Sequence, residues 1–491
     1  MITDTKLINE KIKANAPMSE REIIQAEVNE WLASEKLRRM HKGYQYYAAK
    51  NDILFTPRQI IGEDGQLVKA SNIADNRIAH AFLHELCDQK VSYLLGKPLS
   101  INSDDKRYTE QVDEMLETLQ FQDTLRSAVK DSIIAGIGWL HFYIDANQKF
   151  CVKRMNPTEI IPLWKDEEHT ELDRIIRVYR VVAYHAKQRV MQTWVSCWSE
   201  TSVSHFILDQ GILIENADVG LPTANVTVDG EPYMWEHIPF VAIKYNEEEQ
   251  PLLDMIKTLV DEYDRVVSND SNSLQDQPNS IMVLRNYDGQ DLGGFRHNLA
   301  AYRAVKVSDE GGVDTLETPV RVDASNQHLE RLRRDIYAFG HGVDMHNDVI
   351  GKAVSGIALR QAYSTLDMDV NNMEIGLGKS LKQAVWFINQ FIDVPEDKVP
   401  EWIFNRDIIN VEAEAIEMCV KSKGIISEQT LVANHPWVKD VEKELAQLDE
   451  EKEKSMNEMG GDYPFGNKGQ EKSDVEKDKK TEKTPVKGKD E

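Results

Sequence analysis

Two histidines four residues apart are the first candidates for chemistry in this sequence. His80 and His84 would share one face of a helix, as the two histidine ligands of zinc proteases do. Read from His84, the protease motif requires a second histidine at position 88, but Asp88 stands there. We therefore favour a polar or packed helix face. The alternative is a metal-dependent nuclease that uses His80, His84 and nearby carboxylates.

A short segment, Gly376-Leu377-Gly378-Lys379-Ser380, is similar to the end of a phosphate-binding loop. Such a loop holds phosphates through glycine amides and neutralises their charge with its lysine. The full pattern needs another glycine at position 373, where the sequence has Met373. The segment also lies within a helical pattern instead of between a strand and a helix. An exposed helical segment is the favoured interpretation, and we expect no cofactor.

Two acidic runs, at residues 166–168 and 247–249, have carboxylates of the kind that bind Mg²⁺ in nucleases. Both runs stand beside turn or helix-start signals, where solvated acidic residues are common and favour a helix N-terminus. The sequence contains no G-x-S-x-G motif and no convincing pairing of a cysteine with a histidine. An enzyme is therefore the weaker interpretation.

Basic residues are the remaining chemical signal. They include Arg285, Arg296, Arg303, Lys306, Arg331, Arg333, Arg334 and Lys352. Scattered lysine and arginine side chains are normally solvated or ion-paired, and a face for nucleic acid is the less common interpretation. Their spacing alone does not decide between the two.

The overall charge argues against tight binding of nucleic acid. The 491 residues include 58 Lys and Arg against 83 Asp and Glu, a net charge of −25, whereas phosphate binding needs clustered basic residues. The four cysteines are far apart, so neither a zinc ribbon nor a dense disulfide framework is indicated. The longest uncharged apolar stretch, residues 132–144, is too short to cross a bilayer, which takes about 20 residues.

Helical patterns dominate the first part of the chain. Apolar residues recur at three- and four-residue steps, which predicts amphipathic helices at residues 19–40, 76–95 and 108–135. Residues 139–241 are instead β-branched and aromatic between turn signals. That pattern predicts an antiparallel α+β unit.

A pair of helices is expected to enclose a small insert. An amphipathic helix of about twenty residues follows Pro251, and Asp323 and Ser325 are N-cap candidates for a second helix. The insert has expected strands at residues 281–284 and 304–307 and expected turns at residues 288–289 and 311–312. The sequence therefore predicts a small module carried on two helices.

The last part of the chain is again mostly helical. A Gly-containing segment at residues 344–356 leads into a helix predicted at residues 357–392. Residues 401–409 alternate like a strand, which we expect to return to the earlier sheet. Residues 411–452 are predicted to be helical, with Ser427 as an N-cap. The charged residues from position 455 onward are expected to be disordered.

Several separate segments, taken in order, point to one family. They are residues 76–80 (NRIAH), 88–90 (DQK), 93–98 (YLLGKP), 284–289 (LRNYDG), 307–316 (VSDEGGVDTL), 356–359 (GIAL) and 427–438 (SEQTLVANHPWV). Together they resemble the portal proteins of tailed bacteriophages, of the branch found in Bacillus siphoviruses and related siphoviruses of Gram-positive bacteria. The resemblance covers about residues 31–452, and its strength lies in the order of the segments.

The resemblance implies a portal-type α+β subunit that forms a ring, typically of twelve copies. Its implied parts are an α/β wing, two stem helices that carry a clip, a tunnel loop, a long kinked helix and an α-helical crown. The implied boundaries are wing 21–250 with strand 401–409, stem 251–276 and 322–343, clip 277–321, tunnel loop 344–356, long helix 357–392 and crown 411–454. The resemblance implies no role for the N-terminal arm, residues 1–20, or for the charged tail, residues 455–491.

The implied function is a head-tail connector at one capsid vertex, without catalysis of its own. Double-stranded DNA would pass through its channel during packaging and ejection. The implied partners are other copies of the chain, the large terminase, the major capsid and scaffolding proteins and a head-tail adaptor, with no membrane. The expected location is the virion, and the host cytoplasm during assembly.

The resemblance also suggests which residues act. His346, Asn347 and Lys352 in the tunnel loop are the expected DNA-proximal residues. Arg285 and Arg296 in the clip are the expected contacts for terminase.

Overall fold

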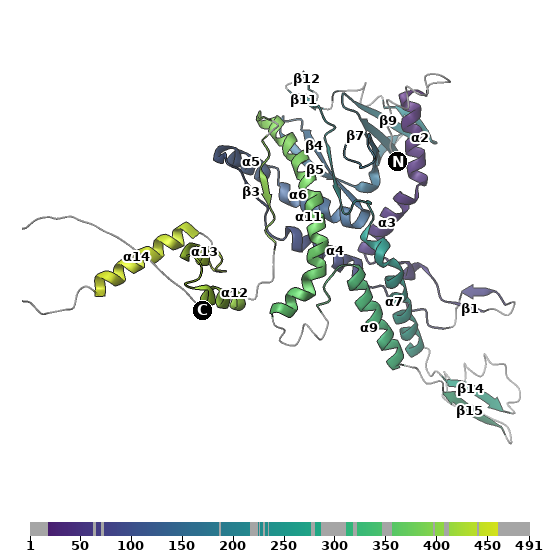
Figure 1. Ribbon diagram of the computed structural model, residues 1–491. Coiled ribbons are helices and arrows are strands. Elements are labelled where there is room, and N and C mark those ends of the chain that lie inside the picture. Colours follow the sequence, from purple (N-terminus) through teal and green to yellow (C-terminus); the bar gives the residue numbers. More distant parts are fainter. Residues whose placement is uncertain are drawn as a thin grey trace, which may run out of the picture. The chain divides into compact units, whose positions relative to one another are not determined.

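The protein divides into two compact units, Met1–Ile408 and Ile409–Glu491, shown in Figure 1. The computed structural model describes residues 18–61, 65–69, 73–185, 188–216, 224, 226–228, 231–233, 235–275, 280–285, 311–317, 322–345, 356–395, 398–406, 412–438 and 441–459. Among these residues, no helix has both the length and the apolar character needed to span a bilayer.

The predicted antiparallel α+β unit is confirmed, and its strands form more than one sheet. A five-stranded antiparallel sheet has the order β10-β9-β8-β7-β6. Its strands are β6 (Ile160–Trp164), β7 (Leu172–His185), β8 (Gln188–Trp198), β9 (Val203–Asp209) and β10 (Ile212–Glu215). A three-stranded antiparallel sheet has β4 (Ile137–Ile144) between β13 (Phe240–Lys244) and β5 (Phe150–Met155). Two small hairpins pair β1 (Gln59–Ile61) with β2 (Leu67–Lys69) and β11 (Val226–Val228) with β12 (Glu231–Tyr233).

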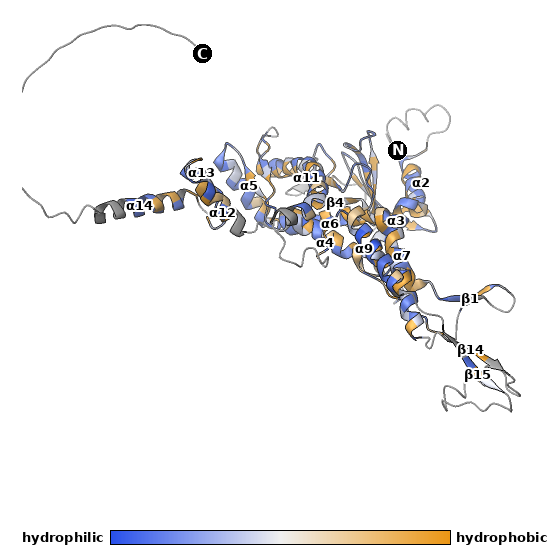
Figure 2. Cartoon of the chain, turned by 60° about the horizontal axis from the view of Figure 1, so that its bottom comes forward, coloured by the Kyte–Doolittle hydropathy of each residue, from blue (hydrophilic) through white to orange (hydrophobic). Residues whose placement is uncertain are grey.

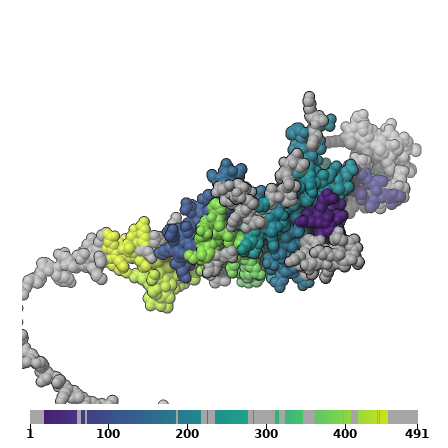
Figure 3. Space-filling model, turned by 90° about the horizontal axis from the view of Figure 1, so that it is seen from above, coloured from purple at the N-terminus to yellow at the C-terminus, as the bar shows by residue number. Residues whose placement is uncertain are grey.

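The helix predicted at residues 19–40 is in fact two helices, α2 (Glu20–Ala33) and α3 (Glu35–Tyr47). Ser34 breaks the helix because its backbone is extended, at φ −69° and ψ 149°, and its hydroxyl accepts the Leu37 N–H. Figure 3 shows α2 in purple at the surface beside residues of the five-stranded sheet. The contact includes a hydrogen bond of 3.1 Å from Leu213 N of β10 to Gln25 Oε1.

The helix predicted at residues 108–135 is also two helices, α5 (Lys106–Thr118) and α6 (Phe121–Ala135). Gln120 separates them with a φ of 48°, in the left-handed region that an α-helix cannot continue through. Asp105 caps α5 by accepting the Tyr108 N–H. Helices α2 and α3 bury residues in the same hydrophobic cluster, so the apolar periodicity runs across Ser34. The buried residues of α5, Tyr108 and Val112, instead form a small cluster with Ile101.

The helix predicted at residues 76–95 begins later, as α4 (Phe82–Leu95). Residues 76–80 are non-helical, and side chains of another helix bind their backbone N–H groups. Two short 3₁₀ helices, η1 (Asp52–Phe55) and η2 (Pro157–Glu159), complete this part of the chain.

The predicted pair of helices is present as α7 (Leu252–Gln275) and α9 (Val322–Phe339), which lie side by side in Figures 1 and 2. Figure 2 colours both helices with mixed orange and blue residues, as expected for amphipathic helices. A 2.6 Å hydrogen bond joins Ser325 Oγ of α9 to Asp270 Oδ2 of α7. Asp323 and Ser325 lie inside the first turns of α9, so neither is its N-cap.

The insert between these helices contains a hairpin of β14 (Ser280–Arg285) and β15 (Gly312–Glu317). The strand predicted at residues 281–284 is confirmed. The turn predicted at residues 311–312 is wrong, because Gly312 opens β15 and pairs with Arg285. The strand predicted at residues 304–307 and the turn at residues 288–289 lie outside the described residues.

The predicted long helix is confirmed as α11 (Gly356–Ile392). It lies beside the three-stranded sheet, where Phe387 stacks on Phe142 with ring centroids 5.1 Å apart. The strand predicted to return to the earlier sheet does not do so. Instead, β16 (Glu401–Ile403) pairs with β3 (Ser100–Asn102), and the two form a sheet of their own.

Two large hydrophobic clusters form most of the core in the described part of the first unit. One joins α4, α6, β4, α7 and α11, and the other joins α2 and α3 to the five-stranded sheet. Trp139 of β4 is fully buried in the second cluster and stacks on Trp164 of β6 at 6.0 Å. The two clusters meet along β4 and α6, which makes the first unit one packed body.

The second unit contains three helices in its described part, α12 (Glu412–Ser422), α13 (Glu428–Ala433) and α14 (Val441–Met459). The predicted N-cap is confirmed, because Ser427 Oγ accepts the Thr430 N–H at 3.2 Å. An ion pair of 2.7 Å joins Lys452 of α14 to Glu428 of α13. Helix α14 continues past Ser455 into the segment expected to be disordered, and residues 460–491 lie outside the described residues.

Candidate functional site

Most of the residues expected to act lie outside the described part of the chain. This holds for His346, Asn347 and Lys352 of the expected tunnel loop and for Arg296 of the expected clip. Arg285 is the last residue of β14, opposite Gly312 of β15. The structure therefore describes the residues on either side of these segments.

The backbone just before residue 346 is held by side chains from two helices. Gln89 of α4 donates from Nε2 to Val343 O at 2.9 Å and accepts the Val343 N–H at 3.0 Å. Arg333 of α9 binds Asp344 through two hydrogen bonds of 2.7 and 2.8 Å. A two-point amide contact and a forked guanidinium contact each fix orientation as well as position. The segment that follows α9 is thus anchored up to Asp344.

Glycine is required at position 342 because the backbone there passes close to a side chain of α4. A Cβ atom at position 342 would lie 2.1 Å from Leu86 Cδ2 of α4, a distance that no carbon contact tolerates. Leu86 is itself fully buried in the core. Glycine at position 342 therefore lets the chain pass directly over α4 to reach the Gln89 clamp.

A buried ion pair ties the same segment to α11. Lys90 of α4 is fully buried, and its Nζ lies 2.5 Å from Asp369 Oδ2 and 3.2 Å from the carbonyl oxygen of His341. Asp369 also accepts from Tyr245 at 3.1 Å and contacts His341 Nδ1 at 3.3 Å. Burial lowers the pKa of Lys90. Burial alone would raise the pKa of Asp369, but the contacts with His341 and Lys90 outweigh it and lower that pKa.

A ladder of polar side chains on α7 binds the extended residues 76–80. Asn272 Oδ1, Ser268 Oγ and Asp264 Oδ1 accept the backbone N–H groups of residues 76, 78 and 80 at 2.6, 3.0 and 3.0 Å. The three acceptors are at most 3% exposed. They recur every four residues along the helix, about 6 Å, which matches two residues of extended chain at about 6.6 Å. The ladder explains why α4 cannot begin at Asn76.

The two histidines do not converge on a metal site. His80 lies before α4, and its Nδ1 is 2.7 Å from Asp264 Oδ1 of the ladder. His84 lies on α4, 3.1 Å from the carbonyl oxygen of Tyr47 and 3.3 Å from Asp88 Oδ2. Within the described ranges, no group of three or more His, Cys, Asp or Glu side chains could hold a metal ion. The geometry gives the nuclease alternative no support.

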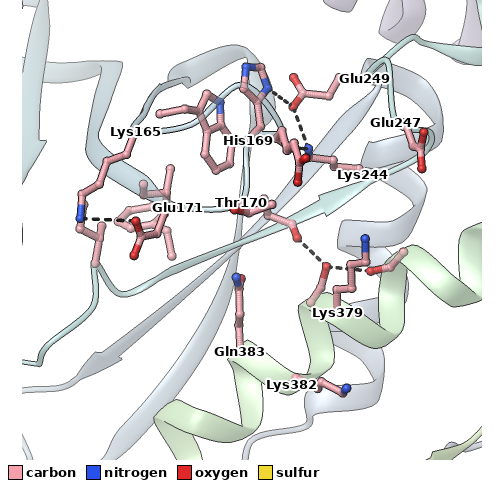
Figure 4. A pocket seen from close by; sticks show the side chains of 18 of the residues that line it. Lys165, His169, Thr170, Glu171, Lys244, Glu247, Glu249, Lys379, Lys382 and Gln383 are labelled. Carbon is pink, nitrogen blue, oxygen red and sulfur yellow. Dashed lines mark hydrogen bonds and ion pairs between the residues drawn. The ribbon is translucent and has the colours of Figure 1, made fainter. Parts of the chain in front are cut away.

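The two acidic runs, expected to be ordinary solvated turns, meet at one pocket of about 1370 Å³. Figure 4 shows its two sides. The turn between β6 and β7, the end of β13 and the turn after it form one side, and α11 forms the other with Lys379, Lys382 and Gln383. Asp166 shapes the first turn by accepting the N–H groups of Thr170 and Glu171 at 2.8 and 2.6 Å.

Glu249 is the buried centre of this site. Its carboxylate lies 2.6 Å from Lys36, 2.7 Å from His169 and 3.6 Å from Lys244. Burial alone would raise the pKa of Glu249, but hydrogen bonds from His169 and Lys36 lower it to about 2. His169 also stacks on Trp164 with ring centroids 5.0 Å apart. Glu249 is therefore a structural ion that locks the two turns together.

The remaining carboxylates give the pocket an acidic surface. Glu167, Glu168, Glu236, Glu247 and Glu248 are exposed at its lining. The arrangement suits a ligand that carries positive charge beside an apolar group. Both acidic runs are evident in the sequence, but no sequence pattern predicts a contact between residues 80 positions apart, such as His169 and Glu249.

The segment similar to a phosphate-binding loop lies inside α11, as predicted, and forms part of the pocket wall. Ser380 is only 8% exposed and donates its hydroxyl to the carbonyl oxygen of Ala242 at 2.6 Å. The amides of residues 376–380 lie within a continuous α-helix. They are therefore not free to cradle a phosphate, and the segment is less exposed than expected.

The first unit thus combines a helical pair with a β-hairpin insert, an anchored segment after α9, and a long helix against an antiparallel sheet. The family model described as phage portal protein, SPP1 Gp6-like, matches residues 33–458, and the chain belongs to this family. Its function is that of a phage portal protein, a component of the virion capsid.

Two phage proteins are similar along most of their length. The portal protein of Bacillus phage SPP1 is 30% identical over 420 residues, which cover 84% of this chain and 83% of that protein. The portal protein of Clostridium phage phiCD119 is 29% identical over 435 residues, which cover 85% of this chain and 93% of that protein. Neither similarity supports the nuclease alternative.

Proposed function

We propose that this portal protein forms a ring, typically of twelve copies, at one capsid vertex and is the channel for double-stranded DNA. In this ring, α7 and α9 are the stem, residues 277–321 are the clip and residues 344–356 are the tunnel loop. Helix α11 is the long helix, residues 411–454 are the crown, and residues 21–250 with β16 are the wing. The observation that supports these assignments best is the α7–α9 pair, which carries an insert and leads into an anchored segment.

The chain is proposed to act as a conduit and docking platform without catalysis. A channel must surround DNA without holding it, and a strongly basic wall would bind phosphates through many salt-dependent contacts. The net charge of −25 avoids this outcome, and a few basic points such as Lys352 suffice to face the duplex. The proposed partners are the large terminase, the major capsid and scaffolding proteins and the head-tail adaptor, with assembly in the host cytoplasm.

The tunnel loop is tested by packaging in a reconstituted system of proheads, terminase and ATP. We expect Lys352→Ala, or a loop shortened between residues 345 and 355, to form rings of normal stability but to reduce DNA packaging about tenfold. Lys106→Ala on the exposed start of α5 is the control and should leave packaging unchanged. Equal packaging by the shortened loop would contradict the assignment of the loop to DNA.

The clip is tested by terminase binding. Arg285→Glu and Arg296→Glu reverse charges that are proposed to face the terminase, so both variants should form rings and bind the terminase at least tenfold more weakly. Lys106→Glu is the matched charge reversal outside the insert. Unchanged terminase binding by rings of both variants would refute the choice of these residues and leave the portal assignment intact.

A further inference from the structure

The β7–β8 hairpin extends beyond the rest of its sheet. On one edge, β6 pairs with β7 only as far as Arg177, and on the other edge β9 pairs with β8 only from Thr193 onward. Beyond these limits, residues 181–185 and 188–192 pair only with each other among the described strands, and residues 178–180 pair only with β8. We call residues 178–185 and 188–192 the β7–β8 ribbon. Two-stranded hairpins are marginally stable in water and gain stability by packing against another surface.

One face of this ribbon is apolar and basic. Val182 pairs with Met191 and Tyr184 pairs with Arg189, and directly opposed residues of antiparallel strands share a face. On this face Val182, Met191 and Tyr184 are 39%, 51% and 73% exposed. Arg180 lies on the same face, two residues from Val182. Residues 178–192 contain three Lys and Arg and no Asp or Glu, in a chain of net charge −25.

The pocket around Glu249 has the complementary character. Nine carboxylates line it against five lysines. Its wall also includes the aromatic side chain of Trp386 and Ile375 of α11, and Ile375 is 68% exposed. An aromatic and aliphatic surface flanked by arginines could therefore contact the apolar wall of the pocket while its arginines pair with the carboxylates.

The ribbon of a chain cannot fill the pocket of the same chain. Glu171 lines the pocket and immediately precedes β7, so the pocket lies at the start of that strand. Tyr184 is twelve residues beyond Leu172 in the same strand, which at about 3.3 Å per residue separates them by roughly 40 Å. The two complementary surfaces lie at opposite ends of one strand, the arrangement needed for a head-to-tail contact between copies.

We propose that the β7–β8 ribbon of one copy docks into the Glu249 pocket of the next copy. Tyr184 and Met191 would contact Ile375 and Trp386, and Arg180 and Arg189 would pair with carboxylates such as Glu247 and Glu248. Because each copy donates a ribbon and receives one, the contact is heterologous and closes into a ring when the rotation between copies permits it. The inference rests on the ring proposed above and names the surfaces that form it.

Charge reversal in the ribbon tests this contact. Wild-type protein, Arg180→Glu/Arg189→Glu and the control Lys106→Glu/Arg107→Glu would be compared by native mass spectrometry across a hundredfold range of concentration. We expect the control to form rings as the wild type does, and the ribbon variant to need at least tenfold more protein. Adding Glu247→Arg/Glu248→Arg to the ribbon variant should restore rings.

A cross-link tests the geometry directly. Tyr184→Cys and Ile375→Cys in one chain should give, after addition of the oxidant diamide, a ladder of disulfide-linked multimers on a non-reducing gel. The single variants and Tyr184→Cys with Leu274→Cys are controls for adventitious bonds, because Leu274 is equally exposed at 68% but lies far along α7.

The outcomes separate this inference from the proposed function. If wild-type and ribbon variants form rings at the same concentration and the double cysteine variant gives no ladder, the ribbon-pocket contact is overturned and the ring stands. If the wild type forms no ring at any ionic strength, the proposed ring itself fails. If the ribbon variant instead loses binding to capsid protein while its rings persist, the ribbon serves the capsid and the inference is wrong.

Discussion

At the scale of single residues, buried polar groups decide how distant segments join. Asp264 is fully buried and accepts hydrogen bonds from the His80 N–H and from Asn51 Nδ2, the latter at 2.6 Å. A buried acceptor that satisfies several donors leaves all of them unpaired when it is removed, and each unpaired group costs about 1–3 kcal/mol. The α7 ladder and the Glu249 cluster both contain buried acceptors of this kind.

Asp264→Ala should therefore loosen residues 76–80 specifically. We expect it to lower the free energy of local opening by about 3 kcal/mol and to speed hydrogen exchange at the Ile78 and His80 amides about 100-fold. Arg265→Ala, on the exposed neighbouring position of α7, should change exchange little because it loses only a surface ion pair. Unchanged protection of the two amides in Asp264→Ala would show that the ladder does not hold the segment.

Glu249 should make stability depend on acid. Its pKa is about 2 in the folded chain against an ordinary 4.5, so the carboxylate stabilises the fold above pH 4.5, and this contribution is lost as the pH falls toward 2. The difference corresponds to about 3 kcal/mol. Glu249→Gln should thus lower the thermal unfolding midpoint at pH 7, and its deficit should shrink progressively below pH 4.5. Glu247→Gln, at an exposed position of the same turn, should show no such pH-dependent deficit.

At the scale of elements, local backbone geometry decided where helices end. Ser34 and Gln120 interrupt apolar periodicities that would otherwise continue, one through an extended cap and the other through a left-handed φ of 48°. Helix α11 shows the opposite behaviour, because it runs through Gly376 and Gly378 without a break. Apolar contacts of α11 with the core, such as that of the buried Leu377, stabilise the helix around its two glycines.

Gly378→Ala should stabilise α11. A Cβ at position 378 meets nothing within 4 Å, and alanine is favoured over glycine in a helix interior by about 1 kcal/mol. The measurement is the thermal unfolding midpoint, which should rise. Gly138→Ala is the contrasting variant, because its Cβ would lie 2.1 Å from the carbonyl oxygen of Ala128, and it should lower the midpoint. A drop in both variants would contradict the open helical environment of Gly378.

At the scale of the whole molecule, charge sets the conditions for assembly. Each chain has a net charge of −25, and a ring brings many such chains together. Repulsion over distances beyond about 10 Å is screened at 0.1 M salt, whereas short ion pairs such as those proposed for the ribbon are screened less. Ring assembly should therefore respond to ionic strength through the net repulsion, and not only through its local contacts.

Raising the salt concentration from about 20 to 200 mM, or adding millimolar Mg²⁺, should shift the protein from small species toward rings. Analytical ultracentrifugation at constant protein concentration measures this shift. A monotonic loss of rings with salt over the same range would mean that local ion pairs, and not net repulsion, dominate assembly.

The sequence by itself determined the local patterns of this protein. Periodicity predicted α7, α9 and α11, β-branched runs predicted the antiparallel strands, and Ser427 was identified as a cap, because these features depend on residues close together in the chain. The ordered segments also pointed to the family, since they needed no knowledge of contacts.

Only the tertiary structure decided which distant residues meet. The pattern of residues 76–80 predicts a helix, but the side chains of the α7 ladder accept hydrogen bonds from their N–H groups. The alternation of β16 predicts a strand of the large sheet, but β16 pairs with β3. The acidic runs were expected to be solvated turns, but Glu249 is buried against Lys36 and His169. In each case a hydrogen-bond or ion-pair partner many residues away changed the outcome, and a pattern read along the chain contains no information on partners that only folding brings together.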